Sequence, residues 1–183
     1  EGLISGVHDP IVPYFPKYQP LANSSPEKDA ITIEDILTMR SGLQYSGDEN
    51  EHEILYAYDP AEAMLSRPVV DIPVGTVWKY NSAGSDILAA LLREVTGKKP
   101  LEYANEKLFR PLGITDVYWF ASDNGTNHGG WGLELSSREM AKFGELYRNR
   151  GVWKGNQIVP ADWTDSATAA RCRQLSAGCG PAN

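Results

Sequence analysis

The side chains that most often bind metals or form catalytic triads are few in this sequence and lie far apart. His8, His52 and His128 fall in separate loop-like segments, and no carboxylate or cysteine lies at a spacing that matches a metal site or a Ser-His-Asp arrangement. The spacing therefore favours surface histidines. We predict no metal site and no cofactor from these residues.

The two cysteines give no stronger signal. Cys172 and Cys179 match no zinc pattern, because no histidine lies near them. Free thiols and one local disulfide are the two interpretations left open. Both cysteines lie in residues 171–183, where helical periodicity fails, so we expect an irregular C-terminal tail there.

Capping patterns predict the helices that must position any site. Thr32 and Ser136 each begin a capping box, and Asp59 precedes a proline at a first helical position. The helix that begins at Thr32 is expected to end before Gly42, and the helix that begins at Ser136 is expected to end at residues 149–151. We expect helices between residues 32 and 42, from 59 to about 66, and over 85–96, 101–109 and 136–149, with a last one near 163.

The strongest helix is predicted over residues 85–96. Apolar residues recur along it at helical spacing and Gly97 closes it, which is typical of a helix packed in a core. The preceding turn and extended segment deliver Tyr80-Asn81-Ser82 to its start. The apolar residues are Ile87, Leu88, Leu91, Leu92 and Val95.

The segments outside these helices differ in composition. Proline spacing in residues 2–16 forbids a long helix and predicts an extended lead-in. Residues 44–58 form a polar, acidic connection. Residues 117–120 indicate a short strand, and a glycine-rich stretch follows at 125–132.

Three stretches, taken together and in this order, resemble one known family. Residues 31–43 are similar to a family helix that ends in Thr-x-x-Ser-Gly-Leu. Residues 73–82 carry Pro-x-Gly and Trp-x-Tyr-Asn-Ser, with the leucine-rich helix, Thr-Gly and Leu-Phe-x-Pro-Leu-Gly-Ile after them. Residues 129–133, with the helix over 137–144, are similar to the family's glycine-rich loop and following helix.

The family is that of the β-lactamase-related serine hydrolases. It includes class C β-lactamases, penicillin-binding-protein-like D-alanyl-D-alanine peptidases, esterases and 6-aminohexanoate-dimer hydrolases. The resemblance covers roughly residues 2–163, the central portion of the family's chain. It implies a mainly α fold with a few short strands, which corresponds to the helical lobe of the α+β β-lactamase and penicillin-binding-protein fold. Most of the central antiparallel sheet is expected to be absent from a lobe at residues 1–170.

The resemblance also implies a site around residue 80. Tyr80 matches the family tyrosine that assists nucleophilic attack and protonates the leaving group, as phenolate or by proton relay; a merely structural tyrosine is the alternative. The family usually has an asparagine two residues later, which orients the substrate. Here Ser82 occupies that position with Asn81 beside it, so amide recognition is expected to differ.

The glycine loop is the other part of the implied site. His128 adjoins Gly129 and Gly130, which in relatives border the substrate cleft, so these three residues are candidate substrate contacts. The five tryptophans fall at family positions next to turns and core helices. Packing is the favoured role for them, with an aromatic or sugar ligand site as the alternative.

The nucleophile is the part that the resemblance does not supply. The family uses a serine with a lysine one helical turn later, in a segment that would lie just before residue 2. Ser25 and Lys28 match Ser-x-x-Lys, but we expect them in a polar loop with no apolar run to bury them, so the match is interpreted as coincidence. The late Lys-Thr-Gly or His-x-Gly strand that completes the oxyanion hole is also not found after Trp163.

Three functional hypotheses follow. The first is part of a serine hydrolase of amide, ester or β-lactam bonds that cannot catalyse acyl transfer alone. The second is a non-catalytic module that binds a ligand or protein in the former cleft. The third is an active hydrolase whose other parts come from a second polypeptide or a cleaved precursor. The substrate in the whole family is a small molecule or a peptide.

Composition and charge limit the classes of partner that the chain is expected to bind. The net charge of −7 comes from 24 acidic and 17 basic residues scattered along the chain, so no basic patch predicts nucleic-acid binding. No apolar run approaches the roughly 18 residues of a membrane span. A helical lobe without its sheet would expose an apolar face, so a homo-oligomer or a complementing polypeptide is expected. The sequence gives no prediction of the compartment.

Overall fold

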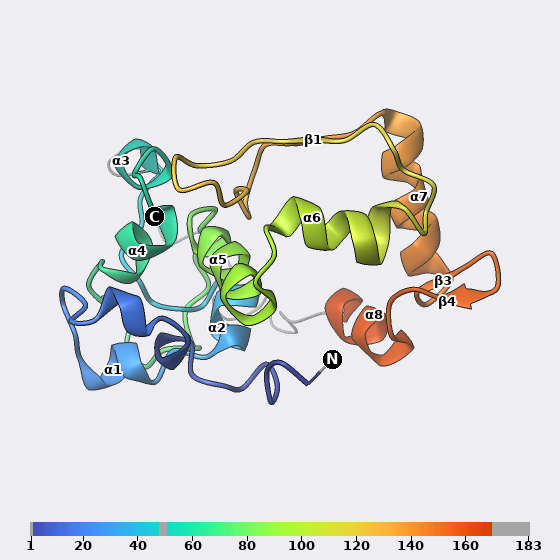
Figure 1. Cartoon of the computed structure of the whole chain (residues 1–183). Coiled ribbons are helices and arrows are strands. Elements are labelled where there is room, and N and C mark those ends of the chain that lie inside the picture. The colour runs from blue at the N-terminus through green and yellow to red at the C-terminus, as the bar shows by residue number, and fades with distance from the viewer. Residues whose placement is uncertain (1, 48–50, 170–183) are drawn as a thin grey trace. The chain divides into compact units, whose positions relative to one another are not determined.

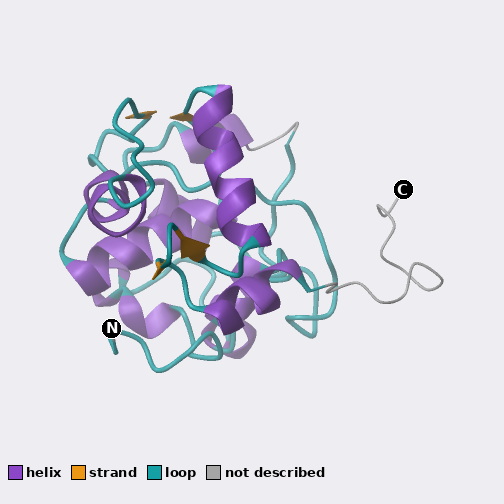
Figure 2. Cartoon of the chain, turned by 90° about the vertical axis from the view of Figure 1, so that its right-hand side faces the viewer, coloured by secondary structure: helices purple, strands orange, loops and turns teal. Residues whose placement is uncertain are grey.

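The structure, a computed structural model, describes residues 2–47 and 51–169 of the chain (Figure 1). Helices dominate these residues, and the strands are short, as expected of the helical lobe (Figure 2). The predicted irregular tail at 171–183, with Cys172 and Cys179, lies outside the described residues. None of the helices in the described ranges is long and apolar enough to cross a membrane.

The described residues form two compact units, each with its own hydrophobic core. The first comprises Glu1–Pro100 and Phe120–Gly132, and the second Leu101–Trp119 and Leu133–Asn183, in each case as far as these ranges are described. The prediction of one lobe over residues 1–170 stays a prediction.

The first unit is built around α5 (Gly84–Thr96), with α2 (Ile33–Leu37) and α4 (Pro60–Leu65) packed against it. Ile87 and Leu91 of α5 are buried in this core with Met64 of α4, as the helical spacing predicted. Gly97 ends α5 with a φ of 69°, the left-handed conformation that favours glycine. The other helices of the unit are α1 (Pro26–Asp29) and α3 (Glu51–Leu55), with 3₁₀ turns at Val12–Tyr14 and Pro16–Tyr18.

The predicted caps begin their helices. Thr32 and Asp35 form the capping box of α2, and Ser136 and Glu139 form that of α7 (Ser137–Arg148). The Asp59 side chain accepts a hydrogen bond from the Glu62 amide at the start of α4. Each cap satisfies backbone N–H groups that have no partner inside their own helix.

The second unit has its core around Phe109 and Leu146. Its strands pair as two antiparallel hairpins, β1 (Tyr118–Trp119) with β2 (Leu133–Glu134) and β3 (Val152–Trp153) with β4 (Asn156–Gln157). Trp119 and Trp153 pack against the core, as expected for tryptophans with a structural role. The helices of this unit are α6 (Pro100–Ala104), a π-helical turn at Asn105–Phe109, α7 and α8 (Ala161–Thr168).

One prediction about a connecting segment is wrong in part, and another connecting segment contains a helix that was not predicted. The lead-in is not simply extended, because it contains two 3₁₀ turns, with Pro13 as the second residue of one and Pro16 as the first residue of the other. Proline is tolerated there, because the first N–H groups of a helical turn have no partner inside it. The connection over residues 44–58 contains α3, a short helix with acids in its first turn. One buried residue, Ile54, holds α3 against the core, which is too weak a pattern to detect by periodicity.

Candidate active site

Tyr80 is positioned by the meeting of two of the motifs found in the sequence. The Gly75 amide donates to the Arg40 carbonyl at 2.9 Å, and the Lys79 amide donates to the Met39 carbonyl at 3.0 Å. The segment before Tyr80 therefore runs beside the chain that leaves α2. The Tyr80 side chain is 60% exposed, so its phenol can be reached from solvent.

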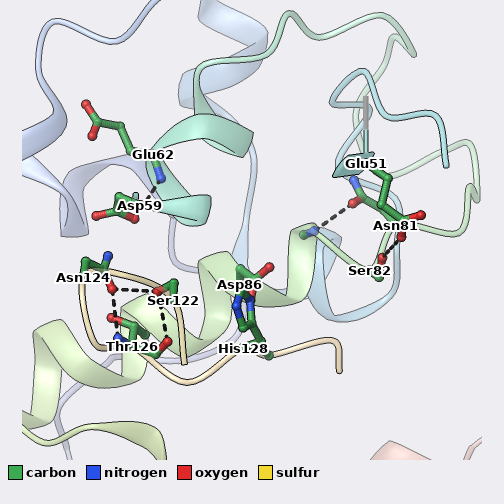
Figure 3. Close-up of polar contacts among 12 residues, drawn as sticks. Glu51, Asp59, Glu62, Asn81, Ser82, Asp86, Ser122, Asn124, Thr126 and His128 are labelled. Atoms are coloured by element: carbon green, nitrogen blue, oxygen red, sulfur yellow. Dashed lines mark hydrogen bonds and ion pairs between the residues drawn. The ribbon is translucent and has the colours of Figure 1, made fainter. Parts of the chain in front are cut away.

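Asn81 forms the start of α5. Its side chain is buried, and its Oδ1 accepts a hydrogen bond from the Gly84 amide at 2.7 Å (Figure 3). This amide is the first of α5 and has no partner inside the helix. The Asn81 amide group is thereby used to fix the turn that follows Tyr80.

Ser82 is also buried, and its hydroxyl belongs to a triangle of oxygens. The Tyr45 hydroxyl donates to Glu51 Oε1 at 2.7 Å, and Ser82 Oγ donates to the same oxygen at 3.0 Å (Figure 3 shows the second of these). Tyr45 and Ser82 also lie 2.7 Å apart, oxygen to oxygen. Burial raises the pKa of Tyr45 to about 12, so its phenol keeps its hydrogen at neutral pH.

The triangle has fewer hydrogens than contacts. The Glu51 carboxylate accepts from both neighbours, and each hydroxyl has one hydrogen to donate, so two hydrogens serve three short contacts. Both are used on Glu51. The Ser82 hydroxyl therefore faces a protein carboxylate and a tyrosine, rather than standing free for a substrate.

His128 is buried, which corrects the prediction of a surface histidine. It is 3% exposed, and its Nδ1 lies 3.2 Å from Asp86 Oδ1, the side chain that faces it from α5 (Figure 3). The same carboxylate oxygen accepts the Gly129 amide at 2.8 Å. The sequence placed His128 42 residues from Asp86, so no local pattern could reveal the pair.

Gly129 and Gly130 lie flush against the start of α5. A Cβ on Gly129 would lie 1.9 Å from the Ser85 carbonyl oxygen, and one on Gly130 would lie 2.5 Å from that of Ser82. These distances leave no room for any side chain. The close approach, rather than an unusual backbone conformation, therefore requires glycine at both positions.

Aromatic rings cover the other side of the loop. The Trp131 ring centroid lies 4.4 Å from that of His128 and 5.2 Å from that of Phe120, to which it is stacked. Tyr56, from the segment after α3, approaches Trp131 at 6.4 Å. Tyr56 and Phe120 are both exposed, so the loop carries an accessible aromatic surface.

Comparison with known proteins gives the family. The Beta-lactamase family model matches residues 5–175, which is most of the sequence. This chain belongs to the Beta-lactamase family. Among curated relatives, a 6-aminohexanoate-dimer hydrolase from Paenarthrobacter ureafaciens is 26% identical over 98 residues, which are 53% of this chain and 25% of that protein. A lovastatin esterase from Penicillium rubens is 31% identical over 109 residues, 52% of this chain and 26% of the esterase.

Solved structures show the fold of the family. A Bacillus anthracis protein provisionally assigned as a 6-aminohexanoate-dimer hydrolase has a TM-score of 0.74 at 22% identity, covering 90% of this chain and 46% of its own. A β-lactamase/D-alanine carboxypeptidase from Yersinia pestis has a TM-score of 0.65 at 19% identity, with coverages of 92% and 52%. The chain spans about half the length of the relatives that it matches over most of its own length.

The Ser-x-x-Lys match does not lie in a polar loop, which corrects that part of the prediction. Ser25 caps α1 by accepting a hydrogen bond from the Lys28 amide. Lys28 is fully buried, its Nζ donates to the Ala22 carbonyl at 2.7 Å, and burial lowers its pKa. Both side chains thus have local bonds that account for their positions without a catalytic role.

The structure brings most of the predicted site of this Beta-lactamase family chain together. Ser82, Gly129 and Gly130 meet at the start of α5, directly after Tyr80. His8 and His52 lie apart from it: His8 pairs with Glu34, and the His52 ring packs on Tyr56. Within residues 2–47 and 51–169, no group of three or more His, Cys, Asp or Glu side chains could hold a metal ion.

Sequence reasoning missed three side chains of the site. Asp86 lies among the apolar residues of α5, which drew attention away from it. Tyr45 and Glu51 lie in the polar connection over residues 44–58. An acid that interrupts the first turn of a core helix was the available signal for Asp86, because a buried carboxylate needs a partner. No signal pointed to Glu51, whose contacts with Tyr45 and Ser82 depend on the folding of α3.

Proposed function

We propose that this chain is the central portion of a serine hydrolase that transfers the acyl group of an amide, ester or β-lactam bond in the whole protein. Tyr80 is the residue that exchanges protons with the nucleophile and the leaving group. The observation that carries the proposal is the exposed phenol of Tyr80, which directly precedes a turn fixed by Asn81, beside two glycines packed against that turn.

The chemistry of acyl transfer explains this arrangement. A general acid or base must be held within hydrogen-bonding reach of the reacting atoms while its functional group stays accessible. The capped start of α5 supplies the rigid support, and the exposed phenol supplies the accessible proton. Gly129 and Gly130 bring main chain to the same place, because only glycine can pack this closely against the start of α5.

The nucleophile in this proposal comes from a polypeptide segment outside the present sequence. Ser25 and Lys28 form the one Ser-x-x-Lys match in the chain, and both are engaged in capping and burying α1. The chain is therefore expected to be catalytically incompetent alone. Relatives named as a 6-aminohexanoate-dimer hydrolase and a lovastatin esterase support amides and esters as the substrate class.

The first experiment is single-turnover hydrolysis of nitrocefin and p-nitrophenyl butyrate by the chain. No burst of hydrolysis product is expected from the unchanged protein or from Ser25→Ala. A burst that Ser25→Ala abolishes would overturn the dismissal of Ser25 and make it the nucleophile.

The second experiment uses the longer polypeptide that contains this chain and a Ser-x-x-Lys helix. There, Tyr80→Phe should lower kcat/KM by roughly 10²- to 10⁴-fold, the usual contribution of general acid–base catalysis. Tyr58→Phe is the matched control, because Tyr58 is also an exposed tyrosine of the same unit. Equal activity of both variants would contradict the catalytic role of Tyr80.

A second candidate is a non-catalytic binding module. The exposed aromatic surface formed by Tyr56 and Phe120 around Trp131 favours it, because such rings bind apolar and planar ligands without any nucleophile. A homo-oligomer or a complementing polypeptide remains part of both proposals. An octameric penicillin-binding-protein homologue from Pyrococcus abyssi, with a TM-score of 0.66 at 19% identity, has the same fold and supports association between copies.

A further inference from the structure

Asp86 is a buried carboxylate to which the proposed chemistry assigns no role. It lies in the first turn of α5 and is 4% exposed. Carboxylates are rarely buried to this degree without a partner, because burial removes the water that stabilises their charge. The contacts of Asp86 should therefore show what its burial achieves.

One oxygen of Asp86 contacts two groups of the glycine loop. Oδ1 accepts the Gly129 amide at 2.8 Å and lies 3.2 Å from Nδ1 of His128. Because a carboxylate oxygen accepts hydrogen bonds, we infer that the Nδ1 atom of His128 carries the hydrogen of this contact. The position of Asp86 in the first turn of α5 also favours a negative charge, because the helix dipole is positive at its N-terminus.

Close packing also fixes the position of the His128-Gly129-Gly130 loop that contacts Asp86. Gly129 and Gly130 approach the carbonyls of Ser85 and Ser82 so closely that no Cβ fits. A tether of two hydrogen bonds and a close steric fit thus act at the same place. The loop residues lie against the turn that follows Tyr80.

We propose that Asp86 is a positioning residue of the site, which holds the His128-Gly129-Gly130 segment against the start of α5. The proposal deepens the proposed function, because it assigns a support to the substrate-facing loop. Asp86 acts through Gly129 and His128 and does not touch the reacting atoms.

The test measures the loop directly, without catalysis. In the full chain, Asp86→Ala should speed hydrogen exchange of the Gly129 amide by about 10- to 100-fold, the range expected when a hydrogen bond to a charged group is removed. Ile87→Val is the matched control, because Ile87 is the neighbouring buried residue and its truncation destabilises the same helix without a bond to the loop. Equal exchange of Gly129 in the two variants would overturn the proposal.

A second variant keeps the test decisive if Asp86→Ala does not fold. Asp86→Asn retains an oxygen that can accept the Gly129 amide but has no charge to hold a hydrogen on His128 Nδ1. Gly129 should then keep most of its protection, while the ¹⁵N signals of the His128 ring change. Unchanged ring signals would contradict the inferred pairing. Absence of turnover in the longer polypeptide would overturn the proposed function, but it would leave these exchange and ring measurements as they stand.

Discussion

Asn81 Oδ1 accepts the Gly84 amide at 2.7 Å, so the residue that directly follows the exposed phenol of Tyr80 also begins the core helix α5. The hydrogen bond joins the segment that carries the exposed Tyr80 to α5, a helix packed in the core of its unit. Tyr80 can therefore be exposed and still be held by a rigid support.

Replacing Asn81 should test this connection. Asn81→Ala removes an acceptor from a buried helix start and should lower the free energy of unfolding by about 1 kcal/mol, within the range of lost helix caps. Asn81→Asp retains the acceptor oxygen and should recover most of the loss. Urea denaturation of the three proteins measures the effect. Equal stability of Asn81→Ala and the unchanged protein would show that the bond contributes little to α5.

Gly129 and Gly144 should respond in opposite directions to the same substitution. Gly129→Ala places a Cβ 1.9 Å from the Ser85 carbonyl and should lower the free energy of unfolding by about 1–3 kcal/mol, as overpacking does. Gly144 lies inside α7 with nothing within 4 Å of its Cβ position, so Gly144→Ala should raise stability by about 0.5–1 kcal/mol. Thermal unfolding of each variant distinguishes the two signs.

These positions also show how far the sequence alone leads. The caps at Thr32, Asp59 and Ser136 were predictable, because each forms hydrogen bonds within three residues along the chain. The burial of His128 was not, because it depends on Asp86, 42 residues away. Patterns along a chain report local bonds and apolar faces, whereas polar pairs between distant segments leave no periodic trace.

The candidate site also contains residues that the sequence could locate and contacts that it could not. Tyr80 and the glycine pair were located by resemblance. Ser82 was predicted as a substrate contact from its position, yet its hydroxyl is bonded to Glu51 and lies against Tyr45. That arrangement depends on α3, whose single buried anchor, Ile54, was too little to predict the helix.

Lys28 should make stability depend on alkaline pH. Burial lowers its pKa below the ordinary value of 10.5, so between these two values the unfolded chain binds more protons than the folded one. Stability from this group therefore rises as the pH rises through that window. Lys28→Met should abolish the rise, whereas Lys154→Met, at an exposed lysine, serves as the control. A rise that persists in Lys28→Met would have to come from another group.

Tyr45 should have the opposite dependence at higher pH. Burial raises its pKa from 10.0 to about 12, so the folded phenol keeps a proton that the unfolded chain has already lost. The stabilising contribution is complete below pH 10 and is lost as the pH rises through about 12. Tyr45→Phe should therefore reduce the steepness with which the free energy of unfolding falls in this range. Denaturant titrations at several alkaline pH values, with Tyr58→Phe as the control, measure it.

The triangle of Tyr45, Ser82 and Glu51 should behave as one unit. Either hydroxyl alone can still donate to Glu51 Oε1, so Tyr45→Phe and Ser82→Ala should each cost about 0.5–1.5 kcal/mol. With both removed, these two donors to the carboxylate oxygen are gone. The double variant should therefore lose more stability than the sum of the single ones, by about 0.5–3 kcal/mol, the range of coupling between residues in one network.

The control for this coupling uses a tyrosine with a different partner. The Tyr18 hydroxyl donates to Asp59 and shares no bond with Ser82, so Tyr18→Phe and Ser82→Ala should have additive effects. Additive effects for Tyr45 and Ser82 as well would mean that the three oxygens act independently. A coupling found only for Tyr45 and Ser82 would show that α3 and the start of α5 are joined through Glu51, and that this network holds the residues beside Tyr80 in place.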